Sequence, residues 1–301
     1  MDPVPLSQSA ALRAANRRGI AAMAGAMAVF VANDALVKYV SQSLPPAQLI
    51  FMRGLMATLL VLAAAQAWGA MPRWREAMGG WVLLRAAVDA VATMLFLVSL
   101  FHLPLAIASA INLAAPLFMV VFAVLFLRER PRPGRWLATA AGFLGVLLII
   151  QPSAAGINGY ALTCLAATLF HATRDLLTRR IASTVPSILI TLATSVAVTL
   201  LAGLLSVLQP WQPFSAAQLG LLALAAALLA SGYHLLITSM RHGEISLVAP
   251  FRYTGLVFAL VLGFAVWGEA PNWLGWAGIA LLLASGLYLL TSERIRGRVR
   301  T

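Results

Sequence analysis

Residues 128–136, "RERPRPGRW", and residues 268–276, "GEAPNWLGW", share one skeleton and differ in charge. Both spell E-x-P-x4-W, once from Glu129 and once from Glu269, at a separation of 140 residues. The first stretch is rich in arginine, whereas the second contains no basic residue. A motif that recurs without its basic residues indicates two copies of one structural unit that lie in different environments.

The same separation relates other positions along the chain, as expected for an internal repeat. Several of the matched residues are of rare types, so their shared separation is stronger evidence for a repeat than any single pair. The pairs are Phe30 and Phe170, Pro46 and Pro186, Gly80 and Gly220, His102 and His242, Phe118 and Phe258, Pro131 and Pro271, and Trp136 and Trp276.

The composition indicates a membrane protein, because 61% of the residues are hydrophobic and 10% are charged. A soluble domain has too little interior for so many apolar side chains. Apolar runs of roughly 20 residues match the length that a helix needs to cross a bilayer. We predict spans beginning near residues 19, 46, 80, 104, 134, 157, 186, 215, 244 and 272. The fold class is therefore an all-α polytopic membrane protein with ten transmembrane helices as two inverted five-helix repeats.

The formal net charge of +12 is distributed unevenly along the chain. Most basic residues fall in alternate connections, which by the positive-inside rule lie in the cytoplasm together with both termini. They are Arg13, Arg17, Arg18, Arg73, Arg75, Arg128, Arg130, Arg132, Arg135, Arg179, Arg180, Arg241, Arg294, Arg296, Arg298 and Arg300. This pattern favours a bacterial inner-membrane protein whose basic tail contacts anionic lipid, with no nucleic-acid partner.

The predicted organisation has a cytoplasmic tail over residues 1–18, a first repeat over 19–151, a second over 157–291 and a basic cytoplasmic tail over 292–301. Because five is odd, the second repeat enters the membrane from the opposite side. The loop at Glu129 then faces the cytoplasm, and the loop at Glu269 faces outward, which accounts for the missing arginines. Inverted repeats are typical of secondary transporters with a substrate site near the midplane.

The two copies of the phrase run on into apolar helices, as "LFLRERPRPGRWLATAAGFLGVLLI" and "FAVWGEAPNWLGWAGIALLLASGLYLL". With ten helices in two inverted repeats, the chain over roughly residues 19–291 resembles the drug/metabolite transporter superfamily, in particular its bacterial aromatic amino-acid and metabolite exporters. The resemblance implies export of a small amphipathic solute, with aromatic amino acids as first candidates, by alternating access around a central cavity.

Two alternatives remain open. One keeps the fold and changes the substrate to other amino acids, nucleosides, polyamines, lipophilic cations or other drugs. The other is an intramembrane enzyme that uses His171 or His234 with an aspartate, and the lack of any H-E-x-x-H-like cluster weighs against it. With the single cysteine Cys164 and no G-x4-G-K-[ST] phrase, we expect no catalytic residue, metal or cofactor.

Charged residues within spans are costly and need partners. Asp34 and Lys38, and likewise Arg85 and Asp89, are spaced i,i+4, so each pair can neutralise itself on one helix face. Their alternative role is proton coupling, for which Asp34, Asp89 and His171 qualify. The sequence does not separate proton antiport from facilitated diffusion.

Arg252 has no acid at i±3 or i±4 and corresponds to Asn112 at the repeat separation. Equivalent positions of inverted repeats face one central space, where a guanidinium suits a carboxylate. Arg53 is expected to snorkel or to pair across helices, and Arg174 and Asp175 are expected at the cytoplasmic interface.

An apolar pocket with a few polar handles is the usual form of a small-molecule site. The predicted substrate-binding residues are Phe30, Asn33, Asn112, Phe170, His171, Tyr233, His234, Arg252 and Tyr253. All eight tryptophans lie near predicted span ends and are expected to anchor at the membrane interface.

Prolines and glycines within the spans predict where helices bend and where they pack closely. Pro116 and Pro250 interrupt the fourth and ninth spans, and together with Gly255 they are predicted hinges. Glycines in the fifth and tenth spans allow close helix contacts, either within one chain or in a homodimer. They are Gly142, Gly145, Gly275 and Gly278.

Overall fold

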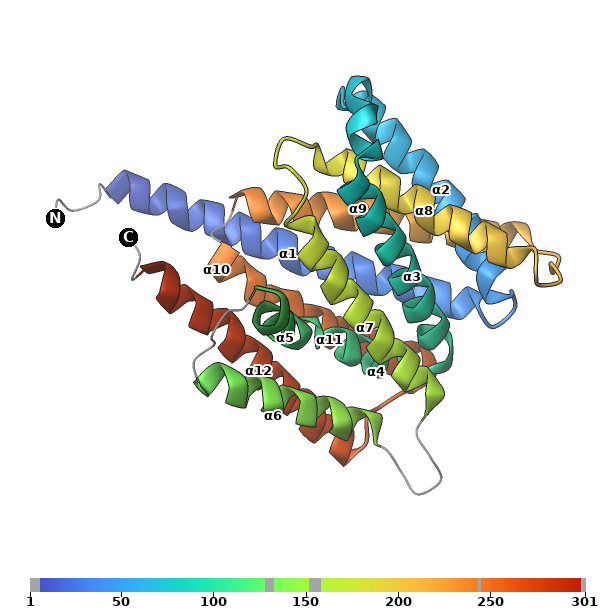
Figure 1. The fold of residues 1–301 in the computed structure, drawn as a ribbon. Coiled ribbons are helices and arrows are strands. Elements are labelled where there is room, and N and C mark those ends of the chain that lie inside the picture. Colours follow the sequence, from blue (N-terminus) through green and yellow to red (C-terminus); the bar gives the residue numbers. More distant parts are fainter. Residues whose placement is uncertain (1–5, 128–132, 152–157, 243–244, 299–301) are drawn as a thin grey trace.

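The computed structural model describes residues 6–127, 133–151, 158–242 and 245–298, and this part of the chain contains helices and no strand. The first half consists of α1 (Leu6–Val40), α2 (Pro46–Ala67), the 3-10 helix η1 (Met71–Met78), α3 (Gly80–His102), α4 (Leu105–Asn112), α5 (Ala115–Leu127) and α6 (Pro133–Ile150). The second half consists of α7 (Gly159–Thr178), α8 (Ser187–Ser206), α9 (Ala216–His242), α10 (Ile245–Val248), the 3-10 helix η2 (Ala249–Tyr253), α11 (Thr254–Trp267) and α12 (Trp273–Arg298). Figure 1 shows that both termini lie at the same end of the molecule.

Nine segments of the described residues are long and apolar enough to cross a membrane, counting α4 with α5, and η2 with α11, as one segment each. The further helix, α7, has 20 residues, and its second half carries His171, Arg174 and Asp175, which make it less apolar. The helices begin near the predicted positions, although α1 and α12 extend into the predicted tails. The predicted fold class is confirmed.

Helices of the two repeats pack against each other in matched pairs. The most extensive contacts join α1 with α9, α3 with α7, α2 with α8, and α6 with α12, so that each pair takes one helix from each repeat. The pairing of α6 with α12 and of α2 with α8 is visible in Figure 1. Each repeat therefore buries apolar faces against the other repeat, and residues of both repeats line the space between them.

Glycines bring α6 and α12 into backbone contact. A Cβ added to Gly145 would lie 2.8 Å from the carbonyl oxygen of Gly278, and one added to Gly278 would lie 2.6 Å from that of Gly145. A Cβ on Gly142 would lie 2.6 Å from Leu117, whereas Gly275 faces its own helix start. These glycines therefore pack within one chain, and a homodimer through the fifth and tenth spans stays a prediction.

Both predicted interruptions are present. The fourth span breaks between Asn112 and Ala115, with Pro116 in the first turn of α5, and the ninth span passes through η2, which has Pro250 in its first turn. Proline has no N–H to donate, so helical hydrogen bonding is already incomplete there. Whether Pro116, Pro250 and Gly255 act as hinges stays a prediction.

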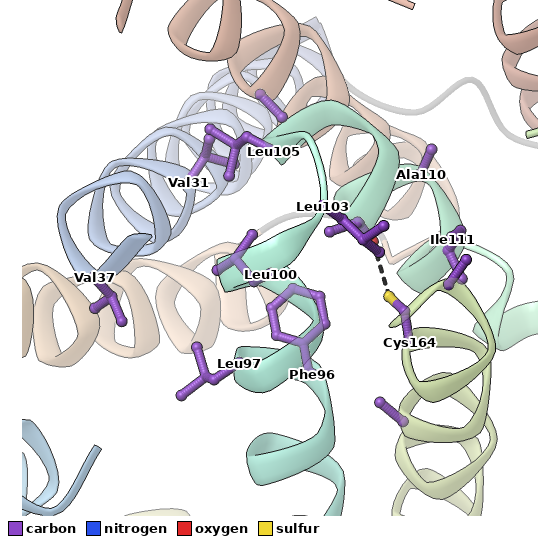
Figure 2. Close-up of a cluster of buried hydrophobic side chains, with 14 of the residues drawn as sticks. Val31, Val37, Phe96, Leu97, Leu100, Leu103, Leu105, Ala110, Ile111 and Cys164 are labelled. Carbon is purple, nitrogen blue, oxygen red and sulfur yellow. Dashed lines mark hydrogen bonds between the residues drawn. The ribbon is translucent and has the colours of Figure 1, made fainter. Parts of the chain in front are cut away.

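The main apolar core takes side chains from helices of both repeats, and Figure 2 shows the part of it around α3, α4 and α7. Phe96 and Leu100 of α3 belong to the same cluster as Ile111 of α4 and Cys164 of α7. Cys164 is fully buried, and its thiol donates to the carbonyl oxygen of Ala108 at 3.6 Å. This core holds the broken fourth span beside α7.

Most tryptophans lie on the outer surface, as expected for an interfacial belt. Trp68, Trp74, Trp81, Trp136, Trp211, Trp273 and Trp276 are exposed. Trp267 is partly buried and packs against the main core.

Candidate functional site

Two adjoining cavities lie between the repeats. Cavity A, of about 150 Å³, is lined mainly by α2, α3 and α8. Cavity B, of about 300 Å³, is lined mainly by α1, α4, α7, η2 and the start of α11. The cavities share the residues Asn33, Asp34, Phe96, His171, Leu229 and Tyr233. The shared wall makes them two compartments of one site.

Asp89 is the centre of a charged cluster between α3 and α7. Its Oδ2 lies 3.4 Å from Nη1 of Arg85, and its Oδ1 accepts from Nη1 of Arg174 at 2.9 Å. Arg174 also contacts Asp175 at 2.9 Å. The Arg85–Asp89 pair is therefore present, but Arg174 completes it. Arg174 turns inward to satisfy the buried carboxylate of Asp89, and the position of Arg174 and Asp175 at the cytoplasmic interface stays a prediction.

A second chain of polar contacts joins α2 to α1. Nη1 of Arg53 donates to Oδ1 of Asn33 at 3.1 Å, and Nδ2 of Asn33 donates to Oδ1 of Asp34 at 2.9 Å. Arg53 thus pairs across helices, one of the two roles expected from the sequence. Its Nε is buried and, within the described residues, has no hydrogen-bond partner.

Lys38 does not pair with Asp34, contrary to expectation. Its Nζ lies 2.6 Å from Oε1 of Glu269 and donates at 2.6 Å to the carbonyl oxygen of Leu103. Oε2 of Glu269 accepts from the backbone N–H of Leu105 at 2.8 Å. Leu105 begins α4, so the carboxylate satisfies a donor that the helix leaves unpaired and complements its dipole. Because Lys38 pairs with Glu269, the carboxylate of Asp34 is left to line cavities A and B.

We call Lys38, Leu103, Leu105 and Glu269 the Lys38 cluster. It joins the end of α1 to the α3–α4 connection and to the segment after α11. The indole ring of Trp267 lies beside it, with its centroid 5.0 Å from Nζ of Lys38. The cluster therefore ties together three parts of the chain at one end of the molecule.

Cavity B brings together the residues next to the two helix breaks. Asn112 ends α4, and its Oδ1 lies 2.8 Å from Nδ1 of His171 on α7. With Oδ1 as acceptor, Nδ1 carries the proton. Arg252 in η2 lines the same cavity, so the positions matched by the repeat do face one space, as predicted.

Aromatic rings cover another wall of the site. Phe30 of α1 meets Tyr233 of α9 edge to face, with ring centroids 5.3 Å apart. Gly232 allows this approach, because a Cβ there would lie 2.5 Å from Cε1 of Phe30. The site thus combines aromatic surface with buried charge.

Six of the predicted binding residues line these cavities, and three do not. The six are Phe30, Asn33, Asn112, His171, Tyr233 and Arg252. His234 is exposed on the outside of α9 with its ring 5.7 Å from that of Trp68, since it points away from its neighbour Tyr233. Tyr253 packs against Gly286 of α12, and Phe170 is rotated away from the wall that holds His171.

Sequence reasoning missed the polar face of α8 and the inward turn of Arg174. Thr191, Thr194 and Ser195 line cavity A. Their i, i+3, i+4 spacing within an otherwise apolar span was a visible signal of a face turned away from lipid. Within the described residues, no group of three or more His, Cys, Asp or Glu could hold a metal ion. The arrangement suits recognition of a polar solute with an apolar body.

Comparison with known proteins identifies several similar transporters. The pseudopaline exporter CntI of Pseudomonas aeruginosa is 30% identical over 88% of this chain and 93% of its own length. A riboflavin transporter of Rhizobium johnstonii is 31% identical over 72% of each chain. An S-adenosylmethionine uptake transporter of Rickettsia conorii is 23% identical over 87% of this chain and 89% of its own.

The fold also matches a solved structure described only as the crystal structure of a protein. The TM-score is 0.63 at 19% sequence identity, over 93% of this chain and 99% of the other. One family model matches twice, over residues 17–151 and 158–291, in agreement with the two halves of the fold. The chain therefore belongs to the EamA-like transporter family, within the drug/metabolite transporter superfamily.

Proposed function

We propose that the protein is a secondary transporter that exports small amphipathic metabolites from the bacterial cytoplasm, with aromatic amino acids as the first candidates. The observation that carries this proposal is the pair of joined cavities lined by both repeats, with Phe30 and Tyr233 beside charged residues. Family membership supports transport of small metabolites, and neither the family nor the named relatives point to an enzyme.

Alternating access follows from the inverted repeats, which rock around a shared site. In this proposal the repeats over residues 19–151 and 157–291 are the moving units, and the helix breaks at Pro116 and Pro250 absorb the bending. The arginine-rich connections and both termini lie in the cytoplasm by the positive-inside rule. The Lys38 cluster then closes the outer end in the present conformation.

A second substrate class has specific support from the relatives. They are named for transport of pseudopaline, riboflavin and S-adenosylmethionine, so the family includes transporters of metabolites other than aromatic amino acids. Cavity B, with Arg252, Asn112 and His171, offers the polar groups that such solutes need.

Counterflow in proteoliposomes tests the function. Vesicles with purified protein are preloaded with unlabelled tryptophan, phenylalanine, lysine, riboflavin, S-adenosylmethionine or buffer, and uptake of labelled phenylalanine is followed without an imposed gradient. Accumulation with the aromatic loads and not with lysine supports an aromatic amino-acid carrier. The same experiment with labelled riboflavin or S-adenosylmethionine tests the second class, and protein-free vesicles are the control. Absence of counterflow with every load from folded protein would contradict the proposed substrates.

Energy coupling by protons is a further part of the proposal, and Asp34 is its best candidate. Asp34 lines both cavities and, within the described residues, accepts a hydrogen bond from the neutral Asn33 and forms no ion pair, whereas Asp89 is held by two guanidinium groups. Asp34→Asn is expected to retain counterflow and to lose uptake driven by a proton gradient. Equal loss of both activities would remove Asp34 as a coupling residue.

A further inference from the structure

Several hydrogen-bond donors of cavity A are already in use. Arg85 donates to the hydroxyls of Thr194 and Thr178 and contacts Asp89. The hydroxyls of Thr191, Thr194 and Ser195 donate to carbonyl oxygens one turn earlier in α8, at 3.0, 3.0 and 2.8 Å. The three hydroxyls of α8 therefore offer oxygen acceptors to a solute, but no spare donor.

Arg53 is the more sparsely bonded of the two arginines that line cavity A. It is 5% exposed, lines cavity A, and makes one hydrogen bond, to the neutral amide oxygen of Asn33. The ion pairs within the described residues do not include Arg53, and its buried Nε has no partner there. The charge of Asp34 acts on Arg53, and Asn33 is bonded to both side chains, but the guanidinium still has few hydrogen bonds for a buried group.

We propose that cavity A is the carboxylate-binding compartment of the transport site, with Arg53 as the group that recognises the anion. This inference rests on the proposed function and names the chemical class of the solute. A planar guanidinium matches the two oxygens of a carboxylate, and the charge-assisted bonds supply the missing compensation of Arg53.

The neighbours of Arg53 fit the part of a solute next to its carboxylate. Ala57, Val61, Leu97 and Val198 give cavity A an apolar side. At about 150 Å³ the compartment holds the anionic end of a metabolite, while the rest extends past Tyr233 into cavity B. Such a solute carries a carboxylate at one end and an aromatic or otherwise apolar body.

Matched probes test this on the purified full chain in detergent. L-Phenylalanine is compared with L-phenylalaninamide, and 3-phenylpropanoate with 3-phenylpropanamide, by the shift in thermal unfolding over a concentration series. Each carboxylate is expected to bind roughly 10- to 100-fold more tightly than its amide, as loss of a charged hydrogen bond implies. Equal binding of acid and amide would overturn the proposal.

Three arginine variants assign the preference to one compartment. Arg53→Gln is expected to remove the preference for the acid, Arg53→Lys to keep part of it, and Arg252→Gln, in cavity B, to retain it. Loss of the preference in Arg252→Gln alone would overturn the proposal and move the anion to cavity B.

A measurement on the unchanged protein avoids any folding defect of the variants. Phenylglyoxal modifies guanidinium groups, and mass spectrometry of the peptides gives the labelled fraction at Arg53 and Arg252 separately. Phenylpropanoate is expected to slow labelling of Arg53, while phenylpropanamide is not. Labelling of Arg53 that is unaffected by the acid would contradict the inference.

Failure of this inference and failure of the proposed function are distinguishable. Counterflow with no acid preference at Arg53 would leave the transporter standing and remove the carboxylate compartment. Binding of the acids that depends on Arg53, without counterflow of any tested solute, would keep the compartment and remove the proposed substrates.

Discussion

Lys38 and Arg53 are both almost completely buried, 6% and 5% exposed, yet they have very different partners. Lys38 meets a carboxylate and a carbonyl oxygen, each at 2.6 Å, and its carboxylate partner also caps α4. Arg53 meets one neutral amide, and its Nε is left without a partner within the described residues.

The difference distinguishes two roles of buried charge, namely closure of one end of the molecule and recognition of the solute. A buried charge with full compensation holds elements together, and removing one partner leaves the other uncompensated. A buried charge that lacks hydrogen-bond partners lies at a cavity wall, where a bound solute can supply the missing hydrogen bonds. The Lys38 cluster fits the first description and Arg53 the second, while Asp89 combines the two because it faces cavity A and has two cationic partners.

The largest effect is expected from Asp89→Asn. This change leaves Arg85 and Arg174 without their shared acid, and removing one partner of a buried pair costs about 3–5 kcal/mol. We expect the free energy of unfolding to fall by this amount, measured by thermal and denaturant unfolding in detergent. Asp175→Asn is the matched control, because Asp175 is 38% exposed and its loss costs far less. Equal effects of the two changes would show that Asp89 is not the centre of the cluster.

Lys38→Met is expected to cost slightly less, about 3 kcal/mol, since the partner Glu269 is 20% exposed. The double variant Lys38→Met with Glu269→Gln should recover a large part of this loss, because no charge is then left unpaired. A double variant as unstable as the single one would contradict the assigned pairing.

The native Cys164 gives a second measurement of the Lys38 cluster. Cys164 is buried beside α4, which the cluster caps, so its maleimide labelling reports opening of this end. If the cluster closes the outer end, the double variant labels faster than the unchanged protein. An unchanged labelling rate would separate the cluster from gating while leaving its role in stability.

The sequence predicted those features of the fold that depend on local signals. Span length, the prolines at the two breaks and the constant repeat separation led to the correct fold class, and the repeat placed Asn112 and Arg252 at one cavity. Ion-pair partners depend on tertiary packing instead. The i,i+4 spacing suggested Asp34 for Lys38, but Glu269, 231 residues away, is the partner, with Oε1 2.6 Å from Nζ of Lys38.

Helix orientation limited the prediction of the site in the same way. Neighbours such as Tyr233 and His234 differ by about 100° around a helix, so one faces the cavity and the other the outer surface. The polar character of both residues could not decide between these faces. Only the packing of α9 against α1 does, through the contact of Phe30 with Gly232.

The smallest effect on stability is expected from Arg53→Met, although its burial equals that of Lys38. The change removes one hydrogen bond to Asn33 but also an incompletely compensated charge, so the free energy of unfolding should change by less than about 1 kcal/mol. Unfolding of this variant is compared with that of Lys38→Met under the same conditions. A loss as large as that of Lys38→Met would mean that Arg53 is already compensated in the protein, and the contrast between closure and recognition would not hold.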